Sequence, residues 1–471
     1  MMTNVPGDDY YQSVILRWDE ASGSFKEACK EGNKSSLAYQ NNLLNNDWSI
    51  SIDHEQTPFI EKIVAAVESI DGVGTKVQIY TNQFENIFQA REKKEIDWEE
   101  AKKQATELWF RMLMDLKAMN ADDLRGGEIA IGVTNIIDIN HLTWARWHLF
   151  QDSMSLAMKR AIQTTKIAMT AGETAVLWSN AHAKYAQKTI KQLLKALEGI
   201  LVQDTTTNKR ALELTQEWVN MIEAKLEQID FNIWGTTLGF KTETPKLINL
   251  ENYTYYDIIA FEEKNENGII GPRSNGITKI RESMEQIMGD WRENKTFEDF
   301  MNTIDSSKQS KIPERVIEVC TGKKLRDIAT GTTTVFNPFI ANELLWWFEW
   351  TPKARIAKLI HVTGNPLKKI TEWIGNEKYK VELNIGAVTV PQIITLLQAA
   401  LDISDDQAMN KWNMGVPYAI VAYPWDHPEI AKLAQDKWFK TTVIWHAITK
   451  IYPEEKNSIK WVWLWRSNIK F

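Results

Sequence analysis

Runs of apolar residues separated by polar stretches divide the chain into blocks, and the spacing inside each block predicts its secondary structure. Residues 61–70 form an apolar run that predicts a strand, and residues 129–139 form a longer run typical of a buried strand. Residues 98–119 instead carry apolar side chains at helical spacing, with Trp109 and Leu113 on or near one face. The first part of the chain is therefore predicted to combine strands with helices.

The pattern continues through the rest of the chain. A helix over 152–165 leads into a short strand over 166–170, and the stretch 182–229 is helical in character. The later part predicts strands over 233–240, 257–262, 356–362, 416–423 and 440–448, and helices over 277–288, 390–401 and 428–437. Because strands and helices alternate in both halves, the fold class is predicted as α/β or α+β.

Shifts in composition divide the chain into three parts. Residues 1–58 are rich in Asn, Ser, Asp and Lys, which predicts a polar, irregular lead-in. Residues 59–235 and 236–471 are predicted as two domains of similar size, with insertions near 180–230 and near 290–330. A chain of 471 residues is long enough for two domains with well-sealed cores.

The charge balance is mildly acidic. Lys and Arg number 55 against 62 Asp and Glu, a formal net charge of −7, so nothing global favours nucleic acid or an anionic membrane as a partner. No apolar run is long enough to span a bilayer, and the first residues lack the apolar core of a signal peptide. Cys29 and Cys320 stand far apart, outside any metal-binding spacing, so a reduced, cytoplasmic setting is expected.

The hexapeptide Asp71-Gly72-Val73-Gly74-Thr75-Lys76 follows the first predicted strand directly and carries the clearest candidate chemistry. Its two glycines let backbone N–H groups approach a phosphate closely, its lysine can meet the phosphate charge, and its aspartate can hold the accompanying magnesium. The spacing is not that of a Walker A loop, and Asp-Gly is also a common turn dipeptide. Alone, the motif favours phosphate binding only modestly.

Four further clusters place polar residues beside predicted strands or helix ends. They are Asp115–Leu124, Ala171–Ala175, Gly271–Gly276 and His361–Pro366. The third is a polar turn that opens a helix, which offers free N–H groups to an anion. Each cluster taken alone is explained more simply as a helix end, a cap or a buried core histidine.

Taken in order, these motifs resemble those of aminoimidazole ribonucleotide synthetase, the phosphoribosylformylglycinamidine cyclo-ligase family. The match extends from about residue 60 to about residue 450, and Asp71–Lys76 is identical to the family's motif. The other clusters, together with Asn413–Val416, match less closely. Departures from the family pattern are Asp122 for Asn, Ala171 for Gly, Arg273 for His, and Asn365 and Pro366 for two glycines.

The resemblance implies ATP-dependent ring closure of formylglycinamidine ribonucleotide to aminoimidazole ribonucleotide, a step of purine biosynthesis, with Mg²⁺ as the companion of ATP. Phosphoryl transfer needs the cation, the lysine and the backbone donors that the motifs provide. Proton transfer falls to His361 or Glu173, and the residues do not decide between them.

The site residues that the resemblance implies fall into four groups. The metal ligands are Asp71, Asp123 and Glu173; the nucleotide contacts are Asp71, Gly72, Gly74, Thr75, Lys76, Asp115, Asp123 and Thr174; the substrate contacts are Ser274, Asn275, Thr363 and Gly364; the catalytic residues are Lys76, Glu173 and His361.

The resemblance also implies a two-domain architecture. The N-terminal domains of two copies are expected to pair in a homodimer with a barrel-like interface, and the C-terminal domain is expected to be a mixed sheet with helices on one face. The expected partners are this second copy and a small phosphoribosyl substrate, with no nucleic acid and no membrane.

Other members of the same superfamily are the main alternatives. A selenophosphate synthetase needs a reactive Cys or selenocysteine in a Gly-rich loop near its start, which Cys29 matches poorly. A hydrogenase-maturation relative ends in a cysteine, whereas this chain ends in Phe471. A thiamine-phosphate kinase lacks the Asp-Gly-Val-Gly-Thr-Lys form. The departures in the loops also allow a paralogue or scaffold that has lost turnover.

Tryptophan is unusually abundant, with 21 residues against 22 glycines. Several occupy positions where the family has glycine or where a glycine-rich loop is expected: Trp147, Trp178, Trp346, Trp347, Trp350 and Trp445. We hypothesise that many of them are encoded by UGA codons, which the source translates as glycine. We expect such tryptophans to be exposed or strained in turns. The alternative is a genuinely Trp-rich protein with indoles in its core, as the apolar settings of Trp109 and Trp412 indicate.

Overall fold

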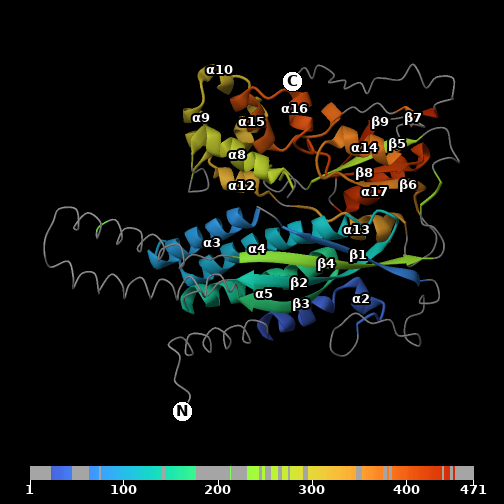
Figure 1. The fold of residues 1–471 in the computed structure, drawn as a ribbon, viewed down its shortest axis with the longest axis horizontal. Helices are drawn as coiled ribbons and strands as arrows, with labels where there is room; N and C mark the ends of the chain where they lie inside the picture. Colours follow the sequence, from blue (N-terminus) through green and yellow to red (C-terminus); the bar gives the residue numbers. More distant parts are fainter. Residues whose placement is uncertain are drawn as a thin grey trace, which may run out of the picture.

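In the computed structural model of the chain, the residues whose structure is described are 23–44, 63–73, 76–139, 144–176, 213, 231–242, 247–249, 256–263, 268–273, 276–289, 295–331, 333–345, 353–374, 379–380, 385–437, 440–445 and 449–450. Their helices and strands form two layered units, each built on a four-stranded sheet (Figure 1). Both units combine strands with helices, which confirms the predicted α/β class.

The first sheet has the strand order β1-β4-β2-β3. Its strands are β1 (Ile63–Gly72), β2 (Ile129–Ile139), β3 (Ala168–Val176) and β4 (Phe231–Thr242), and the helices packed with it are α2 (Leu37–Gln40), α3 (Lys76–Glu92), α4 (Trp98–Ala121) and α5 (Trp144–Thr165). β2 and β3 run parallel, whereas β4 pairs antiparallel with both β1 and β2. β4 crosses the predicted domain boundary between residues 235 and 236; the domain ranges themselves stay a prediction.

One face of this sheet is covered by α3, α4 and α5. Val133 of β2 is buried in the same core cluster as Trp109 of α4 and Phe150 of α5. The period-two alternation of β2 therefore positions one face of the strand against the helices. At the start of α4, the Asp97 side chain caps the helix by accepting a hydrogen bond of 2.8 Å from the Glu100 N–H.

The opposite face of the first sheet is only partly covered by the described elements. At one end, Leu37 and Ala38 of α2 pack on Ile129 and Ile131 of β2. Elsewhere it leaves large apolar side chains in solvent: Ile70 is 69% exposed, Ile136 49% and Trp234 47%. Exposed apolar residues on one sheet face are typical of an interaction surface.

The second sheet has the order β6-β8-β5-β9, and all its neighbouring strands are antiparallel. Its strands are β5 (Asp257–Glu262), β6 (Ile356–His361), β8 (Tyr418–Ala422) and β9 (Lys440–Trp445). The remaining elements are α8 (Ile277–Met288), α9 (Phe297–Thr303), α10 (Ser306–Gln309), α11 (Glu314–Cys320), α12 (Leu325–Ala329), α13 (Asn337–Phe339), the π-helix η3 (Ile340–Leu344), α14 (Pro366–Ile374), β7 (Tyr379–Lys380), η4 (Ile385–Ala387), α15 (Gln392–Leu401), α16 (Asp405–Met409), η5 (Pro424–Asp426), α17 (His427–Asp436) and β10 (Thr449–Lys450).

Helices cover both faces of the second sheet, not one face as the resemblance implies. Ile258 and Ala260 of β5 pack with α8 and α15, whereas Ile259 and Phe261 pack with α13 and α17. β5 and β8 are buried along their whole length, as strands covered on both sides must be. The sheet is also antiparallel throughout its described strands, where a mixed sheet is expected.

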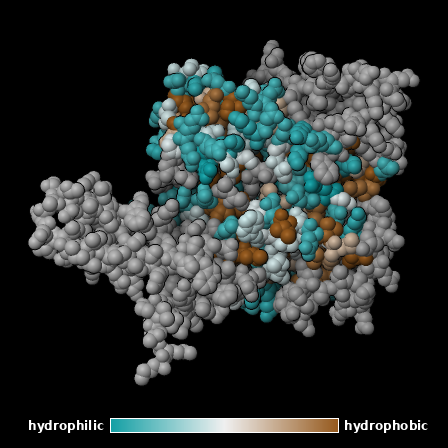
Figure 2. Space-filling model, in the orientation of Figure 1, coloured by the Kyte–Doolittle hydropathy of each residue, from teal (hydrophilic) through white to brown (hydrophobic). Residues whose placement is uncertain are grey.

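α13 lies between the two sheets and ties them together (Figure 1). The Asn337 amide nitrogen donates to the Glu128 carbonyl at 3.0 Å, and its oxygen accepts from the Ala130 N–H at 2.8 Å. On the face seen in Figure 2, hydrophilic residues cover most of the described second unit, and apolar residues form small separate patches. Among the described helices, none combines the length and the apolar character that a bilayer crossing requires.

Part of the predicted lead-in is ordered structure. Residues 23–33 are helical, and Phe25 and Cys29 are buried in the core that α4 and α5 share. Their spacing of four residues puts both on one helix face, so this segment docks on the first unit. The prediction of an irregular lead-in is therefore wrong for residues 23–44. Most of the predicted insertion near 180–230 lies outside the described residues, whereas the described part of that near 290–330 forms α9 to α12.

The expectation that tryptophans sit strained or exposed in turns is wrong for Trp147. This residue lies in α5, is 3% exposed and packs against Phe150 with 6.2 Å between ring centroids. Trp109 and Trp412 are buried as expected. Among the described residues, none of those with positive φ is a tryptophan. Trp178, Trp346, Trp347 and Trp350 lie outside the described residues, and Trp445 is described only as part of β9.

Candidate active site

Asp71 lies at the end of β1, where three hydrogen bonds fix the chain. The Asp71 N–H donates to the Asn120 side-chain oxygen at 2.9 Å, and the Asn120 amide donates back to the Asp71 carbonyl at 3.3 Å. The Gly72 N–H donates to Oδ1 of Asp71 at 2.7 Å. Because Asn120 is in the last turn of α4, the strand end and the helix end are held together.

Two aspartates follow α4 directly, and each meets the second unit. Oδ1 of the buried Asp122 accepts from the N–H groups of Phe336 and Asn337 at 2.9 and 2.8 Å. Asp123 keeps 30% of its side chain exposed and contacts Nδ1 of His361 at 2.9 Å. The end of α4 therefore supplies one carboxylate for the contact between the units and one that reaches solvent.

His361 is the last residue of β6 and is fully buried. Its Nε2 lies 3.1 Å from Nη1 of Arg273. A guanidinium only donates hydrogen bonds, so Nε2 accepts and Nδ1 carries the proton that goes to Asp123. Both ring nitrogens are thus used within the protein, and His361 orients Asp123 in this conformation.

Arg273 is the centre of this buried network. Its Nε donates to Glu263 at 2.5 Å, its Nη1 donates to Asp122 at 2.9 Å, and its Nη2 donates to the Thr334 carbonyl. The guanidinium also lies over the Phe336 ring, 5.0 Å from its centroid. These partners come from both units, so one arginine joins the two sheets beside the candidate site.

The ionisation of the two aspartates reflects their surroundings. Burial raises the pKa of Asp71, and the nearby charge of Asp123 raises it further against the hydrogen bond from Gly72. Burial also acts to raise the pKa of Asp123, but the hydrogen bond from His361 and the charges of Arg125 and Lys369 outweigh it and lower the pKa. The two carboxylates therefore repel each other electrostatically, an arrangement that a cation relieves.

Lys76 and Asp115 are closed inside the protein, although the sequence predicts nucleotide contacts for both. Nζ of Lys76 lies 2.7 Å from Oδ2 of Asp115, and both side chains are fully buried. Tyr80 donates to the same carboxylate at 2.6 Å, and the Thr333 hydroxyl donates to it as well. Lys76 opens α3, which packs against α4, so its ammonium points into the helical layer. In this conformation neither charge is available to a phosphate.

Glu173 and Thr174 are described only as part of β3. The pairing of β2 with β3 shifts between Asn135–Ala171 and Ile137–Thr174, so two residues of β3 oppose one of β2, as in a β-bulge. Bulges are over-represented next to active sites because they redirect a side chain. Gly74, Thr75, Ser274 and Asn275 lie outside the described residues, whereas Thr363 and Gly364 are half-buried two and three residues past His361.

Sequence reasoning misses the roles of Arg273, Asp122 and Glu263. The turn Gly271–Gly276 marks Arg273 only as a departure from the family motif, and Asp122 only as a replacement for Asn. Glu263 follows β5 without any local signal. Among the described residues, no group of three His, Cys, Asp or Glu side chains is arranged to hold a metal ion.

Comparison with known proteins gives structural similarities only. No family model and no curated protein matches the chain. The structure is similar to thiamine-monophosphate kinase from Stenotrophomonas maltophilia K279a, with 10% identity, a TM-score of 0.40, and 84% of this chain and 85% of that chain covered. It is also similar to E. coli HypE, a hydrogenase maturation protein, with 11% identity, a TM-score of 0.43 and coverage of 93% and 91%. It is also similar to T. maritima PurL complexed with AMPPCP, with 8% identity and a TM-score of 0.35. That match covers 82% of this chain and 40% of that chain.

Proposed function

We propose that this protein is an ATP- and Mg²⁺-dependent enzyme of the aminoimidazole-ribonucleotide-synthetase-like superfamily. The observation that carries the proposal is the proximity of Asp71 and Asp123 at the ends of β1 and α4: the side chain of Asn120, three residues before Asp123, hydrogen-bonds to the backbone of Asp71. Asp71 opens the hexapeptide that is identical to the family motif. The end of β1 and the end of α4, which are far apart in the sequence, thus meet where the motif alone suggests a phosphate site.

The carboxylates present fit magnesium. Mg²⁺ is usually bound by one or two carboxylates together with waters and substrate phosphates, rather than by a full set of protein ligands. Asp71 and Asp123 would hold the cation, and Glu173, beside the irregular β2–β3 pairing, is a third candidate ligand. The two aspartates are only partly buried, so a hydrated ion and a phosphate can reach them.

The specific reaction that we propose is ring closure of formylglycinamidine ribonucleotide, which releases ADP and phosphate. Bound Mg²⁺·ATP supplies the phosphoryl group that activates the amide oxygen, and the amidine nitrogen then displaces phosphate to close the ring. Within the chain, Arg273 holds His361, and His361 orients Asp123, which together with Asp71 would hold the cation. Thr363 and Gly364, directly after β6, are candidates for the substrate phosphate or ribose, as are Ser274 and Asn275.

The buried Lys76–Asp115 pair favours a second candidate. A lysine that is closed in an ion pair cannot serve a phosphate, so the chain is alternatively a superfamily paralogue or scaffold with altered catalysis. A thiamine-phosphate-kinase-like or selenophosphate-synthetase-like activity belongs to the same alternative. These alternatives predict either no turnover or turnover with a different acceptor.

A homodimer belongs to this proposal. Ile70, Ile136 and Trp234 leave a row of apolar side chains on the uncovered face of the first sheet. A second copy packed on this face would remove them from water, as the expected barrel-like interface requires. A cytoplasmic enzyme is proposed as well, since neither cysteine is in a disulfide.

The decisive experiment measures the consumption of ATP in the presence of Mg²⁺ with formylglycinamidine ribonucleotide, and separately with thiamine monophosphate or selenide. The expected result is turnover that depends on formylglycinamidine ribonucleotide. Turnover should fall at least about 100-fold in Asp123→Asn, because loss of a direct metal ligand should cost no less than loss of a residue that only supports a ligand. The control is Asp402→Asn, an exposed aspartate with positive φ where asparagine is tolerated. Turnover with another acceptor alone would assign that acceptor, and a folded protein that binds no nucleotide would refute the enzyme.

A further inference from the structure

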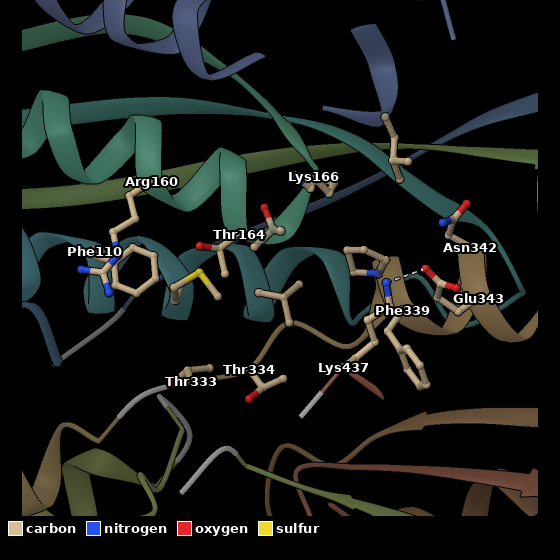
Figure 3. Close-up of a pocket in the computed structure, with 15 residues that line it drawn as sticks. Phe110, Arg160, Thr164, Lys166, Thr333, Thr334, Phe339, Asn342, Glu343 and Lys437 are labelled. Carbon is tan, nitrogen blue, oxygen red and sulfur yellow. Dashed lines mark ion pairs between the residues drawn. The ribbon is translucent and has the colours of Figure 1, made fainter. Parts of the chain in front are cut away.

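A cavity of about 380 Å³ lies between the helical layer of the first unit and the segment 333–343 (Figure 3). Its volume lies in the range of small-molecule sites. It is separate from the candidate active site, because none of Asp71, Asp123 and His361 lines it.

Basic residues outnumber acidic ones in the lining, although the chain as a whole is acidic. The lining contains three basic residues, Arg160, Lys166 and Lys437, and one carboxylate, Glu343. Lys437 forms an ion pair with Glu343 at 3.0 Å at one end of the cavity (Figure 3). Arg160 lies over the Phe110 ring, 3.9 Å from its centroid, and pairs with a carboxylate outside the lining. Since Arg160 and Lys437 are each in an ion pair, Lys166 is the residue of the lining whose charge favours an anion.

The rest of the lining includes an apolar wall. Phe110, Met114, Val335 and Phe339 provide its apolar side chains, and Thr164 of α5 also lines the cavity. Such a surface suits a compact apolar or aromatic body that carries one anionic group.

The wall formed by the segment 333–335 is held from behind. The Thr333 hydroxyl donates to Asp115, and the Thr334 N–H donates to Glu263 at 2.6 Å. The Thr334 carbonyl accepts from Arg273. Because these bonds are made on the side of the buried network, the cavity wall is pre-formed, which lowers the ordering penalty of binding.

Lys166 is kept in an unfavourable backbone conformation at the cavity. Its φ is +61°, in the region that glycine or asparagine normally occupies after a helix. Two hydrogen bonds fix it there: its N–H donates to the Ile162 carbonyl at 2.7 Å, and its carbonyl accepts from the Leu37 N–H at 2.8 Å. In the part of the chain that the structure describes, no carboxylate pairs with this ammonium. A strained, charged residue at the mouth of a cavity points to a function for its side chain.

We propose that this cavity binds a small amphipathic anion, with an aromatic or branched apolar body and a phosphate or carboxylate group. The apolar body lies against Met114 and Val335, and the anionic group meets Lys166. The inference does not depend on the reaction at Asp71 and Asp123.

The test is calorimetric binding of 1-naphthyl phosphate to the full chain, compared with 1-naphthol and with inorganic phosphate. We expect 1-naphthyl phosphate to bind about tenfold or more tightly than 1-naphthol, the size expected for hydrogen bonds to a charged group. Lys166→Gly should weaken binding about tenfold and raise Tm, because glycine relieves the positive φ. The matched control is Lys94→Gly, a lysine with the same φ of +61° outside the lining, which should raise Tm without changing binding.

A second pair of variants tests whether the ligand occupies the cavity, by filling it with a larger side chain. Thr164→Trp places an indole where the lining is, whereas Gln163→Trp puts one on the neighbouring exposed position of α5. We expect the first to abolish binding and the second to leave it intact. Equal affinities of 1-naphthyl phosphate and 1-naphthol, unchanged binding in Lys166→Gly, or no binding to the parent protein would each overturn the proposal.

Discussion

Nη1 of Arg273 lies 3.1 Å from Nε2 of His361, at a point where both side chains are buried. The arginine comes from the turn before α8 and the histidine from the end of β6, and through Asp122 and Asp123 both reach the end of α4. Because the guanidinium can only donate, the contact fixes the protonation site of the imidazole. The orientation of the candidate metal ligand Asp123 thus depends on Arg273, which acts on it through His361.

Removal of Arg273 should be strongly destabilising. Arg273→Met leaves Asp122 and Glu263 buried without their counter-charge, and loss of one partner of a buried ion pair costs about 3–5 kcal/mol. Urea unfolding followed by tryptophan fluorescence measures the change. Arg91→Met, which removes an exposed ion pair, should change stability by about 1 kcal/mol or less. A loss at Arg273 no larger than this would show that the network is not coupled as described.

The two amide substitutions of His361 separate orientation of Asp123 from proton transfer. Asparagine can place its N–H₂ where Nδ1 donates to Asp123, whereas glutamine reproduces the Nε2 end. We expect His361→Asn to keep the Mg²⁺ dependence of ATP binding near that of the parent, and His361→Gln to shift it to about tenfold or more higher Mg²⁺. Calorimetric titrations at several Mg²⁺ concentrations provide the comparison. The reverse order would mean that His361 acts through Nε2.

Local pattern predicts the elements well and the network poorly. β2, β5 and α8 begin and end where the sequence predicts, because each is an apolar run or stripe bounded by polar residues. α3 is missed because Lys76 and Gln83 are among its buried residues, so it lacks a clean apolar stripe. The Arg273 network joins chain segments up to 238 residues apart, and no short motif encodes that proximity.

Lys117 should make stability depend on pH. Burial lowers the pKa of Lys117 to about 7, and the ammonium donates to Thr165 at 2.9 Å and to the Ile167 carbonyl at 2.8 Å. The unfolded chain binds the proton up to about pH 10.4, so between pH 7 and that value the unfolded state holds more protons. Stability should therefore rise with pH, by about 1.4 kcal/mol per unit from this group.

Urea unfolding at pH 7, 8 and 9 measures this slope. Lys117→Met removes the titrating group and should flatten the rise, even though it also changes the absolute stability. Lys159→Met, in an exposed ion pair, should leave the slope unchanged. An identical slope in the parent and in Lys117→Met would exclude Lys117 as its source.

Trp147 allows a test of the hypothesis that UGA codons are decoded as glycine. In the sequence as given, Trp147→Gly opens a cavity beside Phe150 and places a glycine inside α5, so a loss of about 3–5 kcal/mol is expected from urea unfolding. Trp425→Gly, with the indole 78% exposed, should change stability by less than about 1 kcal/mol. If codon 147 is UGA and peptide mass spectrometry of the native protein finds glycine there, the recoding hypothesis holds. If the codon is UGG, it fails.

The uncovered face of the first sheet should mediate self-association. Ile136 lies on this face near Trp234, and both are about half exposed in the single chain. Ile136→Lys places a charge where a second copy would bury an apolar side chain, and an unpaired charge in an interface is strongly unfavourable. We expect sedimentation velocity to show a dimer for the parent and a monomer for Ile136→Lys. Leu156→Lys, on α5 and 47% exposed, should remain a dimer, whereas dissociation of Leu156→Lys alone would place the interface on the helical side.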